Sequence, residues 1–451
     1  MRKYILALLA GLLAASLAAP SYAADFKYTG IFRLRGITAE DLDRNSRSHD
    51  GNQLYDALVR PRFTATSEGG KLWSIFELDY SDSNHIYGST TADTTVAVNR
   101  WLIDFAVPGT TLRARVGRTD YTDPSGEIYD TVGAHRQDGL ALYGKLFGPV
   151  SLSAFTVKLS EGLQAATDSD NHYLALKWQA APQIAITPWI ANSRRNGTTN
   201  TTDYDLYYYA LHGQAKIGIL DITVQGIWQD GTSAEVTGAG RAAGLHDVDI
   251  EAYAIMIRSW LTFGRLKIGL YYTYLSGDDD PVTATGNGAQ QPDNELGRFV
   301  FPTSAGYFEG PNIITGRRWS TITANDPGRG TGNIVSNRTA TGDGRNTQLN
   351  GVNMPEILFK YQVTPAFLLE GGVSLIYSAE RAPDVGATTY KSDKNFGTAF
   401  EMGFRWDIYK QLALWVVGSY LTAGDYGQPS AAGTRGWDDS WAVYYEFRHT
   451  W

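Results

Sequence analysis

The chain has 451 residues, no cysteine and a formal net charge of −8. The lack of cysteine excludes disulfides, zinc–thiolate sites, iron–sulfur ligation and haem attachment through a CxxCH motif. The acidic balance, with no basic patch interleaved with aromatic residues, argues against nucleic acid as a partner.

Residues 1–23 have the pattern of a cleaved signal peptide. Two basic residues begin the chain, a short apolar core follows, and Ser21-Tyr22-Ala23 offers the small residues that a signal peptidase reads. No stop-transfer pattern follows, so an anchoring helix is the weaker interpretation. We expect export after cleavage, and a single barrel domain over residues 24–451.

Strict alternation of apolar and polar residues follows the signal. Phe26, Tyr28, Phe32 and Leu34 share one face of the first expected strand, and the basic residues of the same strand share the other. Hydrophobic residues make up 43% of the chain, yet its mean hydropathy is −0.26. A wall with one face in lipid and one in water has this dispersed pattern, because alternate side chains point to opposite sides.

Short turns and long polar connections alternate along the chain. Counting eight short turns and nine long connections predicts 18 strands, or 16 if the weak region 184–193 is not a strand. We therefore expect an all-β fold, a transmembrane antiparallel β-barrel with short periplasmic turns and long extracellular loops. The longest connection, at about residues 277–352, carries an aromatic segment from Phe299 to Ile314.

The alternation also predicts which charged residues face the lumen. An arginine-rich wall over the first five strands would concentrate anions there. The alternative is that acidic neighbours pair with the arginines, which then stiffen the wall without conferring selectivity. The candidate pore-lining residues are Arg33, Arg35, Arg60, Arg62, Glu77, Asp79, Arg100, Asp104, Arg113, Arg115, Glu401 and Arg405.

The third long connection, Thr119 to Arg136, is a candidate constriction. It contains Asp120, Asp123, Glu127 and Asp130, which could oppose the arginine wall if the segment folds inward. An exposed acidic loop is the alternative.

The last stretch, Asp439 to Trp451, alternates aromatic and polar residues and ends on an aromatic side chain. With the expected strand count, the strand end Arg113–Arg118 and the Phe301-Pro302 pair, it resembles Gram-negative outer-membrane porins, especially the 18-stranded alginate-export-like group. The resemblance implies an integral outer-membrane channel for small polar or anionic solutes, surrounded by membrane lipid. It also implies assembly through the barrel-assembly machinery at the C-terminal strand, and a monomer rather than a trimer.

The sequence favours no enzyme and no cofactor. It has no GxSxG, HExxH or P-loop motif in a fitting context, and its seven histidines are scattered. Two other functions stay open. One is a barrel scaffold that encloses a partner such as a multihaem cytochrome, and the other is a polysaccharide exporter. An outer-membrane enzyme is the least favoured alternative.

Overall fold

The computed structural model describes most of the chain after the expected signal segment. The signal segment itself lies outside the described residues, as does most of the connection at 277–352. The described residues are 25–40, 51–81, 95–126, 137–160, 169–195, 203–235, 248–277, 295–297, 299, 351–380, 393–425 and 439–451.

Strands make up nearly all of this described part. A 3-10 helix, η1 (Glu68–Gly70), forms one turn. The strands are β1 (Asp25–Glu40), β2 (Gly51–Thr66), β3 (Leu72–Ser81), β4 (Thr95–Ala106), β5 (Leu112–Thr119), β6 (Gln137–Phe147), β7 (Val150–Ser160), β8 (Ser169–Ala181), β9 (Ile184–Arg195), β10 (Asp203–Ile217), β11 (Leu220–Glu235), β12 (Val248–Phe263), β13 (Leu266–Leu275), β14 (Glu295–Leu296), β15 (Val352–Thr364), β16 (Phe367–Tyr377), β17 (Asn395–Tyr409), β18 (Leu412–Ala423) and β19 (Ser440–Thr450).

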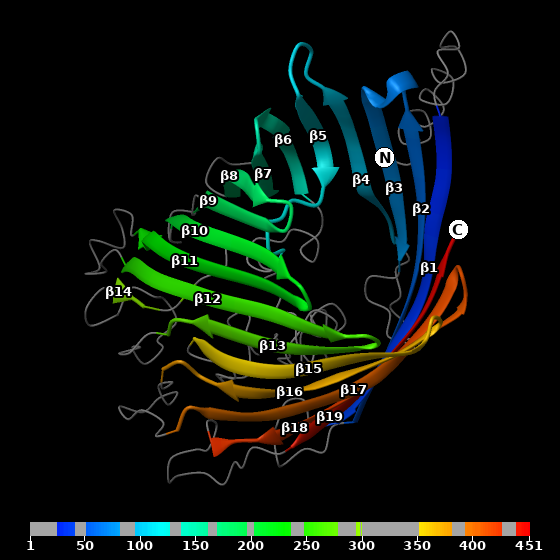
Figure 1. Ribbon diagram of the computed structural model, residues 1–451, viewed down its shortest axis with the longest axis vertical. Coiled ribbons are helices and arrows are strands. Elements are labelled where there is room, and N and C mark those ends of the chain that lie inside the picture. Colours follow the sequence, from blue (N-terminus) through cyan, green and yellow to red (C-terminus); the bar gives the residue numbers. More distant parts are fainter. Residues whose placement is uncertain are drawn as a thin grey trace.

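Eighteen of these strands form a closed antiparallel barrel. Each strand pairs with its neighbour in sequence, except that β13 pairs with β15, and β1 pairs with β19 to close the wall. The C-terminal end consequently lies beside β1 (Figure 1). The short strand β14 lies outside this count, because it pairs in parallel with the end of β12. Closure leaves no unpaired strand edge in the wall, as a lipid environment requires.

The predicted strand count is confirmed, and the described residues refine its details. The uncertain region 184–193 lies within β9, so the 16-strand alternative is wrong. Several strands reach 16 residues, longer than the roughly nine to 11 typical of a tilted membrane crossing, because they continue beyond the apolar zone on the side of the long connections. In the described part of the chain, no helix is long and apolar enough to cross a membrane.

The barrel wall has an apolar outer face. Large apolar side chains at alternate positions are exposed there, among them Leu174, Leu176 and Trp178 on β8. The residues between them, such as Tyr173 and Ala175, are buried on the inner side. This arrangement inverts that of a water-soluble protein, and it fits a wall whose outer face contacts lipid.

The first and last strands meet at a tightly packed seam. Gly30 and Trp451 exchange two backbone hydrogen bonds, of 3.0 and 3.1 Å. The indole of Trp451 lies over Gly30 and contacts the rings of Tyr28 and His449. Only a residue without a side chain leaves room for the indole at this position.

Candidate functional site

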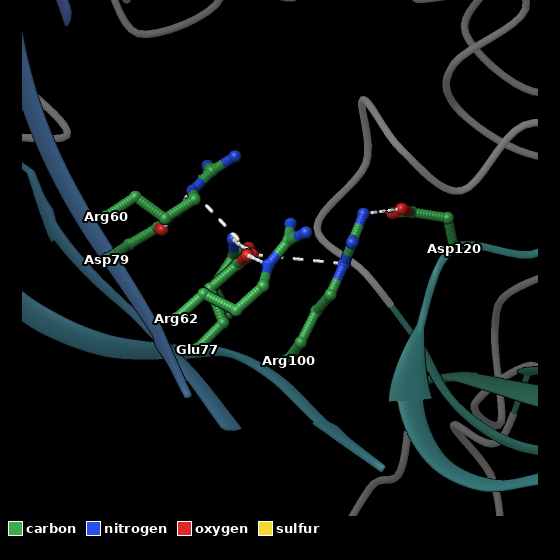
Figure 2. A network of polar contacts seen from close by, with 7 residues as sticks. Arg60, Arg62, Glu77, Asp79, Arg100 and Asp120 are labelled. Atoms are coloured by element: carbon green, nitrogen blue, oxygen red, sulfur yellow. Dashed lines mark hydrogen bonds and ion pairs between the residues drawn. The ribbon is translucent and has the colours of Figure 1, made fainter. Parts of the chain in front are cut away.

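A network of arginines and carboxylates covers the inner face of β2 to β4. The guanidinium of Arg60 donates two hydrogen bonds to Asp79, of 2.5 and 2.7 Å (Figure 2). Arg62 donates to Glu77 at 2.5 Å, and the Glu77 side chain is only 1% exposed. The cross-strand pairing of Arg62 with Glu77 places the two charges on the same face of the sheet.

A β-bulge brings β4 into the same network. Glu77 pairs with Arg100, but Leu78 pairs with Val98, so Asn99 is an extra residue in β4. Asn99 can therefore donate a hydrogen bond of 2.5 Å to Glu77, while Arg100 lies 3.9 Å from the same carboxylate. Bulges commonly redirect a side chain in this way.

A second cluster is centred on Asp104, which is completely buried. Its two carboxylate oxygens accept hydrogen bonds from Arg113 at 2.6 Å and from Arg115 at 3.0 Å. The hydroxyl of Tyr143 on β6 also donates to Asp104. Arg115 in addition lies over the rings of Tyr143 and Trp73, with cation–π distances of 5.0 and 5.4 Å.

All twelve predicted pore-lining residues occupy inward-facing positions of their strands, but they do not form one site. Eight of them belong to the two clusters on β2–β5. Arg33 and Arg35 pair in register with Arg448 and Glu446 of β19. Glu401 and Arg405 lie on β17, where Arg405 donates to Asp407 at 2.9 Å. Their selectivity role stays a prediction.

The first residues of the third long connection fold into the lumen. Asp120 accepts a hydrogen bond from Arg100, so this acid joins the arginine network as the sequence suggested. Asp123 is buried and accepts a hydrogen bond of 2.9 Å from Gln225, which is on β11. The segment therefore crosses the inner face of several strands between β5 and β11. Glu127 and Asp130 lie outside the described residues.

A line of aromatic rings supports this segment. Tyr121 contacts Phe155 of β7 at 5.2 Å between ring centroids, and Phe155 stacks on Tyr173 of β8 at 4.4 Å. Trp189 of β9 follows at 5.6 Å. Burial raises the pKa of Tyr121 to about 12, so its hydroxyl stays protonated and donates to the carbonyl of Gly117.

A cavity of about 580 Å³ lies between this segment and the wall. Its lining includes three cationic side chains, Arg115, Lys145 and Lys177, and the buried His212. Among the described residues, neither lysine has an ion-pair partner. The two acids of the lining, Asp120 and Asp123, are the ones bound by Arg100 and Gln225. Three bases against two acids give the lining a formal charge of +1, because the hydrogen bond from the neutral Gln225 does not cancel the charge of Asp123.

Sequence reasoning did not single out several residues of this site. Tyr143 and Lys145 lie at inward-facing positions of a strand that the sequence predicts. The alternation of apolar and polar residues in that strand could therefore have identified them. Gln225 gave no signal, because its partner Asp123 is about 100 residues away in the chain. The described residues contain no group of three or more His, Cys, Asp or Glu side chains that could hold a metal ion.

The long connection contributes one described aromatic residue to the interior. Phe299 is 3% exposed, and its ring lies edge-on to that of Tyr208, with centroids 6.2 Å apart. Its backbone amide donates to Ser276 at 3.1 Å. The aromatic segment thus packs inside the barrel at its first residue. Its remainder up to Ile314, which includes Phe301-Pro302, lies outside the described residues.

Solved structures share this barrel. OccK8 (OprE) from Pseudomonas aeruginosa has a TM-score of 0.54 and 12% identity over 95% of this chain and 98% of its own. The outer membrane protein OpdK from the same organism has a TM-score of 0.51 and 11% identity, over 94% of this chain and 99% of its own. OccAB4 from Acinetobacter baumannii has a TM-score of 0.54 and 11% identity, over 94% of this chain and 98% of its own.

These likenesses show that the chain shares the barrel fold of these proteins. No family model matches the chain, and no curated protein matches it. The similar structures are Occ and Opd proteins, so the comparison supports the broader porin-like barrel rather than the alginate-export-like group that the sequence suggested.

Proposed function

We propose that this protein is an outer-membrane channel through which small hydrophilic, anionic solutes diffuse. The observation that carries the proposal is the cation-lined cavity between the inward segment and the wall. Arg115, Lys145 and Lys177 face it against two acids, Asp120 and Asp123, which leaves a formal charge of +1. A pore wall with excess positive charge raises the local concentration of anions.

The arginines of β2–β5 support this proposal less directly than the sequence implied. Arg60, Arg62, Arg113 and Arg115 all hold buried or partly buried carboxylates. Such pairs hold the wall and the inward segment in shape, and they leave only a small positive excess. The lysines, which have no described acidic partner, are in our proposal the stronger source of anion preference.

One similar structure supports an anionic solute. It is that of OpdK with vanillate, an aromatic carboxylate, at 10% identity to this chain. We also infer localisation in the outer membrane after signal cleavage, insertion by the barrel-assembly machinery through β19, transport without catalysis, and a monomeric barrel. The inward segment narrows the lumen, which disfavours a sheath around a cytochrome or a wide path for a polysaccharide.

The test removes the lysines of the lumen and leaves the arginine pairs intact. Lys145, Lys177 and Lys216 face inward from β6, β8 and β10, and we would replace all three with glutamine. We expect the ratio of anion to cation permeability, measured as the reversal potential of single channels in a salt gradient, to fall severalfold. One unit charge about 4 Å from a permeating ion in water is worth about 1 kcal/mol, or about fivefold in local concentration.

The matched control also loses three positive charges, but from the outer face of the same strand group. It replaces Arg118, Lys158 and Arg194 with glutamine. An unchanged reversal potential in the lumen variant, with the barrel folded, would contradict anion preference. An equal shift in the control would show that net charge, and not the lumen, sets the potential.

A further inference from the structure

A second, smaller cavity lies on the inner face of β10 to β13, beside the cation-lined cavity. Its volume is about 220 Å³, and we refer to it as the small cavity. Pro124 and Ser125 of the inward segment line it together with these four strands, which are consecutive in the wall (Figure 1). His212 and Gln214 line both cavities, so the two adjoin.

The strand register brings three polar side chains of β10 and β11 together in the small cavity. Gln214 pairs with Thr223 across the two strands, and Asp221 lies two positions along β11, on the same face. Gln214 and Asp221 are exposed although they face the lumen. Among the described residues, none of the three has a hydrogen-bond or ion-pair partner. Their polar groups are therefore available to a solute.

These polar groups suit hydroxyls better than ions. A glutamine amide and a threonine hydroxyl each donate and accept, and a carboxylate accepts. The charges of Asp221 and Arg258 in the lining cancel, and Lys216 lies directly opposite Asp221 in the register. Arg258 is only 8% exposed, and its guanidinium lies 4.6 Å from the ring centroid of Tyr271. An ion therefore meets little net charge here, whereas a hydroxyl finds both a donor and an acceptor.

One side of the small cavity is a fixed aromatic surface. The indole of Trp260 donates a hydrogen bond of 2.6 Å to the hydroxyl of Tyr271. The same indole lies over Gly269, where an added Cβ would be 3.0 Å from it. Because these contacts fix the ring in advance, binding against it costs little side-chain entropy. The indole offers apolar surface to the C–H face of a saturated ring.

The size of the small cavity limits its occupant to a small molecule. Pockets for drug-sized ligands have volumes of about 300–1,000 Å³, and this cavity is smaller. A single saturated ring that carries several hydroxyls has both surfaces that the lining matches, an apolar face and a polar rim. A monosaccharide is a solute of this kind.

We propose that the small cavity binds an uncharged monosaccharide. Trp260 packs against the C–H face of the sugar ring, and Gln214, Thr223 and Asp221 form hydrogen bonds with its hydroxyls. This site goes beyond the anionic solutes proposed above, because the cation-lined cavity gives an uncharged sugar no electrostatic attraction. The inward segment, through Pro124 and Ser125, then separates the lumen into a place for anions and a place for sugars.

Ligand-observed NMR of the detergent-solubilised full barrel, titrated with glucose, tests this proposal. The comparison solute is sorbitol, an uncharged polyol with the same number of carbons but no ring. We expect the unaltered chain to bind glucose more tightly than sorbitol, because an open chain has no rigid C–H face and loses more conformational freedom on binding. Glucose that does not bind, or that binds no more tightly than sorbitol, would overturn the proposal.

The variant Gln214→Leu with Thr223→Val removes two hydrogen-bonding groups from the small cavity. We expect its Kd for glucose to rise about fivefold or more. The matched control, Gln183→Leu with Thr187→Val, makes the same chemical changes at the β8–β9 turn and in β9, outside the lining of the small cavity. It should bind glucose as the unaltered chain does. Heat-modifiable migration on gels checks that both variants fold.

An unchanged Kd in the Gln214→Leu, Thr223→Val variant would contradict the assignment of the site, and so would an equal loss in the control. Neither variant changes a formal charge, so the reversal potential in a salt gradient should stay that of the unaltered chain. Sugar affinity therefore tests the small cavity, and reversal potential tests the anion preference of the lumen. Failure of one proposal leaves the other intact.

Discussion

A substitution at Glu77 tests directly whether the charge of the arginine network affects ions that pass through the pore. The network contains three guanidiniums, from Arg60, Arg62 and Arg100, and three carboxylates, from Glu77, Asp79 and Asp120. Its formal charge is therefore zero. Glu77→Gln changes that charge to +1 and keeps the oxygen that accepts the hydrogen bond from Asn99.

We expect this substitution to raise anion preference. A unit charge acts on an ion about 4 Å away in water with about 1 kcal/mol, and the effect weakens with distance and salt screening. The ratio of anion to cation permeability should therefore rise about two- to fivefold. Arg62 loses its carboxylate partner, but its side chain is 32% exposed, so water compensates part of the cost and the barrel should still fold.

The assay is the reversal potential of single channels in a salt gradient, with heat-modifiable migration on gels as the check on folding. The matched control is Asp138→Asn, which removes one negative charge from the outer face. If the Glu77→Gln barrel is folded and its reversal potential is unchanged, the network does not face the permeation path. A shift towards cations would refute the electrostatic reasoning itself.

Two further substitutions test the packing of the site and of the seam. Gln225→Leu removes the hydrogen bonds that fix Asp123, so we expect a less restrained inward segment, seen as larger and noisier single-channel currents; identical currents would show that other contacts suffice. Gly30→Ile places a side chain where the ring of Trp451 lies, so we expect a loss of about 1–3 kcal/mol and a lower unfolding temperature in heat-modifiability gels. An unaltered temperature would mean that the indole moves aside without cost.

The period of two in the sequence predicts the fold because it assigns each residue to a face of its strand. That assignment placed all twelve candidate residues on the inner side. It does not give the register between strands, since register depends on turn length and on bulges. The extra residue Asn99 in β4 is one such bulge, and it decides that both Asn99 and Arg100 reach Glu77.

Connections are less predictable than strands for the same reason. The acidic residues of the third long connection suggested an inward fold, but they did not identify a partner for Asp123. Its contact with Gln225 depends on the closed shape of the barrel, which brings β11 near the end of β5.

The position of a charge on the wall matters more here than the total charge of the chain. A net charge of −8 would by itself favour cations near the molecule. At 0.1 M salt the Debye length is about 10 Å, so charges on the outer face and in the long connections are largely screened from an ion in the lumen. Lys145 and Lys177 line the cavity itself, and together with Arg115 they exceed its two acids by one charge. An acidic chain can therefore form an anion-preferring pore, provided that its lumen holds the excess of bases.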